Sequence, residues 1–217
     1  MAPARTTQTQ IPDFLYHVVL ITSPSESKDP NATVEQLRIF DSYTTVEKAK
    51  EAAYKTLPSL GYEPQLFSKY ETNLETLEKL APTQGIGIAV YAVAADGSIL
   101  RVRILTTPND QHLTGNANGQ IPLSLYYVVQ TDIQYDNDER RTPNDVNIQA
   151  VFENYSDARK FASNTLLSPQ DGIYKSSYRE YHEAGPKDVD CGYGENVIVH
   201  ASGNAGENYL VSVIQGA

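Results

Sequence analysis

The sequence predicts an α+β fold made by internal duplication of a β-β-α-β-β-β unit, giving two antiparallel-sheet lobes that each have a helix packed on one face. The duplication rests on short matches that occur in the same order in both halves of the chain. Ile11-Pro12, followed by a Leu-Tyr strand start, returns with the same spacing as Ile121-Pro122. Later matches pair Phe40-Asp41-Ser42-Tyr43 with Phe152-Glu153-Asn154-Tyr155, and Gly85-Ile86-Gly87 with Gly192-Tyr193-Gly194.

The matches also predict how the chain is divided. A polar, Thr/Gln-rich segment before the first match is expected to be a disordered leader, and a Gly/Asn-rich segment separates the two copies. The predicted parts are a leader (1–10), a first lobe (11–107), a linker (108–120) and a second lobe (121–217).

Each element of the first lobe follows from residue pattern. β-branched and aromatic runs predict strands, apolar residues at helical spacing predict helices, and Asp96-Gly97 is a favoured hairpin turn. The expected elements are strands at 16–21 and ending at 40, helices at 46–57 and 74–80, a strand at 65–71 and a hairpin of 86–93 with 99–105.

The second lobe repeats this order without the additional short helix. Its proline-bearing loop is expected at 135–145, and alternation of apolar and polar residues predicts a strand at 174–182. The remaining elements are strands at 125–131 and ending at 152, a helix at 158–166, and a closing hairpin of 197–201 with 209–214.

Composition restricts the class of protein. In 217 residues, 40% are hydrophobic and 20% charged, as in soluble globular proteins, and no apolar run approaches the ~18–20 residues of a membrane span. A net charge of −10 argues against a nucleic-acid partner. One cysteine excludes an internal disulfide framework and fits a reducing compartment. The prediction is a cytoplasmic protein with neither nucleic acid nor membrane as partner.

The glycine pair Gly192 and Gly194 raises the possibility of a phosphate-binding loop. It lacks the third glycine of the dinucleotide fingerprint, and a strand follows where that fingerprint needs a helix. Glycines just before a strand are typical of a bulge or a tight entry into the sheet. No cofactor is therefore expected.

A catalytic site would have to come from the second lobe. Cys191 with His182 or His200, oriented by Glu195, has the residue types of a nucleophile, a base and an orienting group. In the repeat alignment His182 corresponds to Glu71 and His200 to Val93, so the first copy lacks the set. A lone cysteine is more often an inert small residue. The four histidines lack metal-site spacing, and no metal is expected.

Binding residues are the other possibility. The chain has 15 Tyr against 5 Phe and no Trp, and tyrosine combines a large contact area with a polar tip. Those without a counterpart in the first copy are freer to bind a partner. We select Tyr193 and Tyr209, together with Asn208 in the lengthened turn of the second lobe.

Two hypotheses remain open from the sequence. The first is a non-enzymatic intracellular binding or interaction protein, which could self-associate through an exposed last strand at 209–214. The alternative is a small hydrolase-type enzyme with its site around His182, Glu195 and His200. Convergence of His200 with Cys191 in a concave pocket would favour the enzyme.

Overall fold

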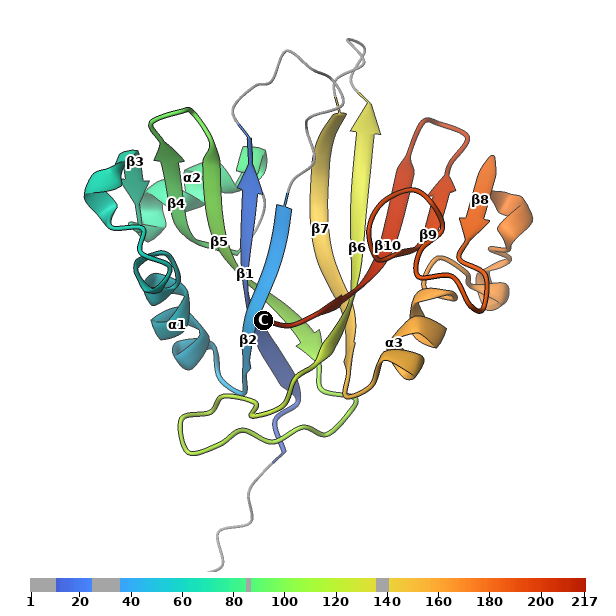
Figure 1. The fold of residues 1–217 in the computed structure, drawn as a ribbon, viewed down its shortest axis with the longest axis horizontal. Coiled ribbons are helices and arrows are strands. Elements are labelled where there is room, and N and C mark those ends of the chain that lie inside the picture. Colours follow the sequence, from blue (N-terminus) through green and yellow to red (C-terminus); the bar gives the residue numbers. More distant parts are fainter. Residues whose placement is uncertain (1–10, 25–35, 85–86, 136–140) are drawn as a thin grey trace, which may run out of the picture.

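Two five-stranded antiparallel sheets, each with a helix packed on one face, form the two lobes of the protein (Figure 1). The computed structural model describes residues 11–24, 36–84, 87–135 and 141–217. The predicted α+β fold and its duplicated unit are confirmed, because the two sheets have equivalent strand orders, β2-β1-β5-β4-β3 and β7-β6-β10-β9-β8. The predicted leader and most of the first polar loop lie outside the described residues.

The elements of the first lobe follow the predicted order. The helix predicted at 74–80 is present and extends further. They are β1 (Phe14–Ser23), β2 (Gln36–Tyr43), α1 (Val46–Ser59), β3 (Phe67–Glu71), α2 (Leu74–Gln84), β4 (Ile88–Ala94) and β5 (Ile99–Pro108).

The second lobe has the same order with no helix in the place of α2. Its elements are β6 (Tyr126–Tyr135), β7 (Arg141–Phe152), α3 (Tyr155–Ala162), β8 (Glu180–Glu183), β9 (Val197–Ser202) and β10 (Asn208–Gln215).

Each main helix is held on its sheet by small residues. Thr45 caps α1 by accepting a hydrogen bond from the backbone N–H of Lys48, and Asn154 caps α3 in the same way. Ala49 and Ala53 of α1 are fully buried, and so are Ala158 and Ala162 of α3. These alanines allow the helix backbone to lie close to the sheet.

The last strand is not an edge, so that prediction was wrong. β10 lies between β6 and β9 in the middle of its sheet and pairs with both along its length. The first and last strands of each lobe pair with one another, a long-range contact that local sequence patterns do not encode. The far ends of the two sheets are β3 and β8 (Figure 1).

Further boundaries differ from the prediction, and α3 ends at Ala162 instead of 166. Only Glu180–Glu183 of the strand expected at 174–182 is extended, because Lys175–Ser177 forms a 3-10 turn in which the Ser177 hydroxyl accepts from the N–H of Tyr174. The loop expected at 135–145 is shorter, since β7 already begins at Arg141. Pro143 is accommodated there because β7 is an edge strand.

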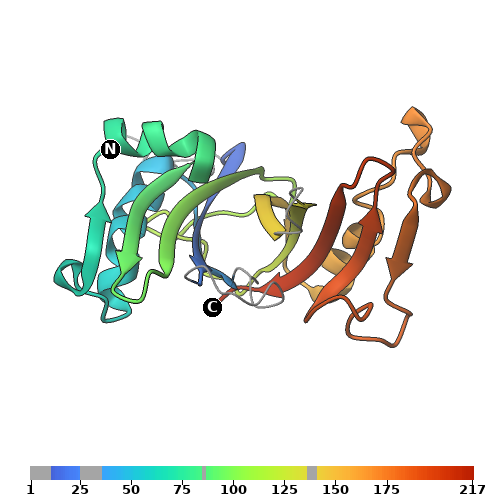
Figure 2. The ribbon, with the colours of Figure 1, turned by 90° about the horizontal axis from the view of Figure 1, so that it is seen from above.

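A shared apolar core joins the lobes along β1, β2 and β5 on one side and β6 and β7 on the other. Seen from above, the two sheets diverge from this central contact (Figure 2). The predicted linker contributes to this core. The side-chain amide of Asn109 donates hydrogen bonds to the backbone carbonyls of Pro12 and Leu113. The core residues are Leu15, Val19, Ile21, Ile39, Leu105, Leu113, Ile121, Leu125, Tyr127, Val129, Val146, Ile148 and Val151.

A buried polar network lies inside this core. The two ring nitrogens of His17 lie 2.7 Å from Oγ of Ser42 and 2.8 Å from Oγ1 of Thr107. The Ser42 hydroxyl also lies 2.8 Å from the hydroxyl of Tyr127, which comes from the other lobe. Burial lowers the pKa of His17 to about 3, so the imidazole is neutral. The network links the lobes and has no access to solvent, because His17 and Ser42 are almost completely buried.

Gly87 marks a tight entry and a bulge before the closing hairpin of the first lobe, whereas in the second lobe the predicted pair Gly192 and Gly194 precedes the equivalent position, Asn196. Gly87 has φ 77°, and a Cβ there would lie 2.7 Å from the carbonyl oxygen of Ile104. A register shift follows between Ile88 and Val90, and the second lobe has one after Val197. The carbonyl of Asn196 accepts from Val213 as that of Gly87 accepts from Ile104, so Gly87 is equivalent to Asn196.

Candidate functional site

Strand pairing defines which residues of the two lobes are equivalent on the sheet face opposite α1 and α3. Tyr91 pairs with Glu71 and Arg101, and His200 pairs with His182 and Leu210. His200 therefore corresponds to Tyr91 and not to Val93, because Gly87 is equivalent to Asn196 and not to Gly194, which moves the alignment by two residues. The equivalence of His182 with Glu71 is confirmed.

The neighbouring row on this face differs more strongly between the lobes. In the first lobe Lys69 pairs with Val93, which pairs with Ile99. In the second lobe the same row reads Glu180, Ser202, Asn208. Two apolar residues of the first lobe are thus replaced by a hydroxyl and an amide in the second.

In the first lobe this face is closed by α2. Leu77 is 3% exposed and packs with Ile88 and Tyr91, and Leu80 completes the cluster with Val93 and Ile99. The ammonium of Lys69 lies 5.2 Å from the centre of the Tyr91 ring at the edge of this cluster. The side of β4 that faces α2 is therefore part of a hydrophobic cluster.

In the second lobe an irregular segment, residues 184–196, takes the place of α2 between β8 and β9. Its Tyr193 ring stacks on His200, with ring centres 3.9 Å apart and planes 15° apart, and lies 4.9 Å from the ring of His182. Tyr193 remains 44% exposed. A single aromatic ring thus covers part of the sheet face that α2 covers in the first lobe.

The start of this segment is anchored by Arg159 of α3. Its guanidinium donates to the backbone carbonyls of Asp188 at 2.7 Å, Gly185 at 2.6 Å and Ala184 at 3.2 Å. Further along, the N–H of Cys191 donates to the carbonyl of Val197 at 2.8 Å. These contacts fix both ends of the loop that carries Tyr193.

His200 is buried between this loop and β10. Burial lowers its pKa below the ordinary value, against a hydrogen bond to Asn208 that opposes the shift, so the ring is neutral at pH 7. Nε2 of His200 lies 3.4 Å from Oδ1 of Asn208, whereas Nδ1 is buried with no hydrogen-bond partner among the described residues. Donation from Nε2–H to the amide oxygen accounts for both observations, since it leaves only a lone pair on Nδ1.

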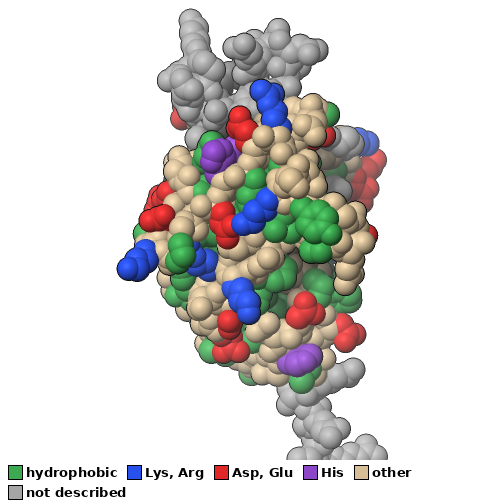
Figure 3. Space-filling model, turned by 90° about the vertical axis from the view of Figure 1, so that its right-hand side faces the viewer, with side chains coloured by type: hydrophobic (Ala, Val, Ile, Leu, Met, Phe, Trp, Pro, Cys, Tyr) green, Lys and Arg blue, Asp and Glu red, His purple; other side chains and the backbone are tan. Residues whose placement is uncertain are grey.

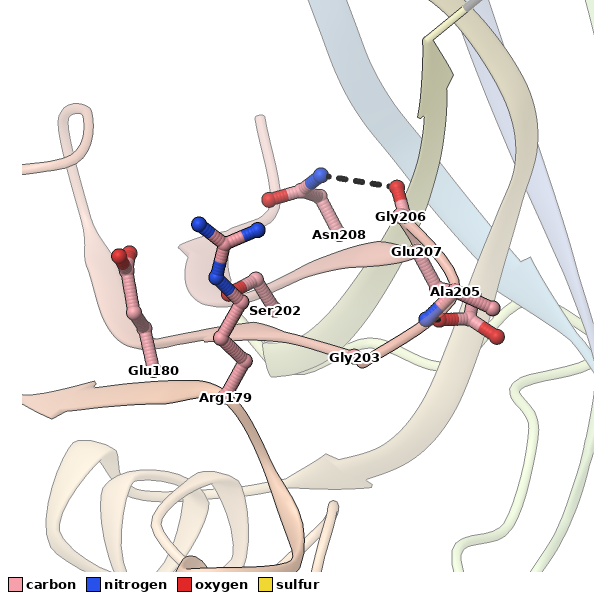
Figure 4. A pocket seen from close by; sticks show the side chains of 8 residues that line it. All are labelled: Arg179, Glu180, Ser202, Gly203, Ala205, Gly206, Glu207 and Asn208. Carbon is pink, nitrogen blue, oxygen red and sulfur yellow. Dashed lines mark hydrogen bonds between the residues drawn. The ribbon is translucent and has the colours of Figure 1, made fainter.

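An open depression adjoins Asn208 on the same face, with a volume of about 640 Å³. Figure 4 shows the side chains of Arg179, Glu180 and Asn208 rising toward the same side, with the Asn208 amide donating to the carbonyl of Gly206. Its lining is mostly polar or charged: Arg179, Glu180, Ser202, Gly203, Ala205, Gly206, Glu207 and Asn208.

The structure brings some of the predicted site residues together and separates others. His182, His200, Tyr193 and Asn208 share the face that carries the depression. Tyr209 points to the opposite face, where its ring meets that of Tyr178 at 6.2 Å.

The nucleophile and its orienting group are placed less favourably for catalysis. Cys191 lies next to the backbone of His200, and burial raises the pKa of its thiol, with backbone N–H groups opposing the shift. Glu195 is exposed in the turn before β9. A raised thiol pKa disfavours the thiolate that a cysteine nucleophile requires.

Arg179, Glu180 and Ser202 were missed by sequence reasoning. The signal that could have found Ser202 is its equivalence to Val93, because a half-buried apolar residue is replaced there by a hydroxyl. The shifted alignment concealed this replacement.

No known protein family, curated protein or solved structure matches this chain. No helix of the described part is long and apolar enough to cross a membrane. Across the described ranges, no three His, Cys, Asp or Glu side chains are grouped so that they could hold a metal ion.

Proposed function

We propose that this is a non-enzymatic binding protein whose ligand site is the open face of β8, β9 and β10. The observation that carries the proposal is the contrast at one position of the duplicated fold. α2 packs against the half-buried Val93 and Ile99 in the first lobe, whereas the second lobe has Ser202 and Asn208 there beside a depression. Half-buried polar side chains are stabilised when a ligand or water forms hydrogen bonds with them.

Binding is better supported than hydrolysis for chemical reasons. The histidine in the site is neutral and donates to an amide, and the neighbouring thiol has a raised pKa. A hydrolase would instead require an activated nucleophile aligned with its base. The single cysteine and the net charge of −10 favour a cytoplasmic location and a partner other than nucleic acid.

The proposal is tested by screening the intact protein against a library of small polar molecules, with binding followed by chemical-shift changes in the backbone amides. Shifts are expected at 179–183 and 200–208. The double variant Ser202→Val/Asn208→Ile, which introduces the first lobe's residues, is expected to abolish them. Glu75→Gln on the exposed side of α2 is the control and should leave binding unchanged.

The proposal would be overturned if every bound molecule changed the amide shifts of other residues only. It would also be overturned if the double variant bound the same molecules as the unmodified protein. Because Val and Ile occur at these positions in the first lobe, the variant is compatible with the sheet, and its fold is checked by the dispersion of the same amide spectrum.

A further inference from the structure

The Tyr193 ring is built as a platform beside the depression. One face of the ring rests on His200, with the planes only 15° apart, and the side chain is 44% exposed. His200 reaches Asn208 through Nε2, and Asn208 lines the depression. His200 thus connects the Tyr193 ring to the Asn208 side of the depression.

Asn208 presents a matched donor and acceptor to this ligand. Its amide has two N–H donors and two oxygen lone pairs. One donor is used by the carbonyl of Gly206, and one lone pair by Nε2 of His200. The remaining donor and acceptor suit a hydroxyl group, which donates and accepts at the same time.

The charges of the depression select against several ligand classes. Arg179, Glu180 and Glu207 all line the depression, so a small anion would meet two carboxylates and a small cation a guanidinium. An apolar ligand would remove water from all three charges without replacing their hydrogen bonds. Figure 3, which views the end of the molecule formed by the second lobe, shows acidic and basic side chains interspersed, with no broad field of one sign.

A neutral ligand rich in hydroxyl groups satisfies all of these conditions. Its hydroxyls accept from Arg179 and donate to Glu180, and the volume of about 640 Å³ lies within the usual range of small-molecule sites. A saccharide ring adds an apolar C–H face that can lie flat on an aromatic ring. We infer that the site binds a neutral saccharide, with one sugar ring on Tyr193 and its neighbour's hydroxyls in the depression. This inference rests on the proposed function.

The test measures binding of defined sugars to the full chain. The probes are glucose, galactose, mannose, N-acetylglucosamine and their short linear oligomers at millimolar concentration, observed by saturation transfer from the protein and by amide shifts. At least one oligomer is expected to shift Asn208 and Tyr193. Tyr193→Ala should weaken it by about tenfold, whereas Tyr193→Phe, which keeps the ring, should bind within about threefold of the unmodified protein.

The control variant is Tyr174→Ala, since Tyr174 is an equally exposed tyrosine of the same lobe outside the depression. Absence of shifts at the site with every sugar would overturn the saccharide inference. The proposed function would still hold if a molecule of another class changed the amide shifts of 200–208. It would be wrong as well if no molecule did. Equal losses of sugar affinity in Tyr193→Ala and Tyr174→Ala would also contradict the role of the Tyr193 ring as a platform.

Discussion

The two lobes share one architecture but cover the same sheet face with different groups. In the first lobe Tyr91 lies under α2, and it is 7% exposed, as is its equivalent His200 in the second lobe. In the second lobe its equivalent, His200, is covered by the ring of Tyr193, and the next row of the sheet is polar. The comparison shows an apolar helix as the cover in one copy, and a single aromatic ring beside polar side chains in the other.

The largest expected effect is on stability at acid pH, where His17 between the lobes is expected to contribute more than His200 at the open face. The folded pKa of His17 is about 3, below the ordinary value of 6.5, so the unfolded chain binds the proton first as pH falls. The stability contributed by neutral His17 is complete above about pH 6.5 and is lost at about 1.4 kcal/mol per pH unit down to about pH 3.

This prediction is measured by urea unfolding at a series of pH values. His17→Gln is expected to flatten the slope between pH 6.5 and 3 by a large fraction of that amount, whereas His200→Gln should change it less, since the His200 site is less deeply buried. Parallel pH profiles for the unmodified protein and His17→Gln would show that the buried network does not control acid stability.

A smaller effect compares the two covers of the sheet face. Leu77→Ala is expected to destabilise the protein by about 2–5 kcal/mol, because it leaves a cavity above Tyr91. Tyr193→Ala is expected to cost about 1 kcal/mol, the contribution of a half-exposed aromatic pair. Urea midpoints of the two variants provide the measurement. Equal losses of stability would mean that the Tyr193 loop is as much a part of the core as α2.

Local patterns in the sequence were sufficient for most of the fold. The alanine spacing of α1 and α3, the Asp96-Gly97 turn and the recurrence of Ile11-Pro12 as Ile121-Pro122 identified the unit and its duplication. Each of these signals lies within one element or one turn, where residue type determines backbone conformation directly.

The errors came from long-range pairing and from the match of the two glycine pairs. Nothing local to 209–214 indicates that β6 will pair with it. Matching Gly87 with Gly194 instead of Asn196 aligned His200 with Val93 instead of Tyr91. Tyr193 was found because the sequence match gave it no tyrosine counterpart in the first copy, and Asn208 because it lies at the end of the lengthened turn. Ser202 was missed because its counterpart was wrongly assigned.

The central claim is that the second lobe offers an open polar face where the first lobe is closed. It is tested most directly by crystals of the protein soaked with a set of small polar organic probes. The account predicts that several different probes gather beside Asn208 and Ser202, and that none enters between α2 and β4. Probes that bind under α2 as often as beside Asn208, or that leave the depression empty, would contradict it.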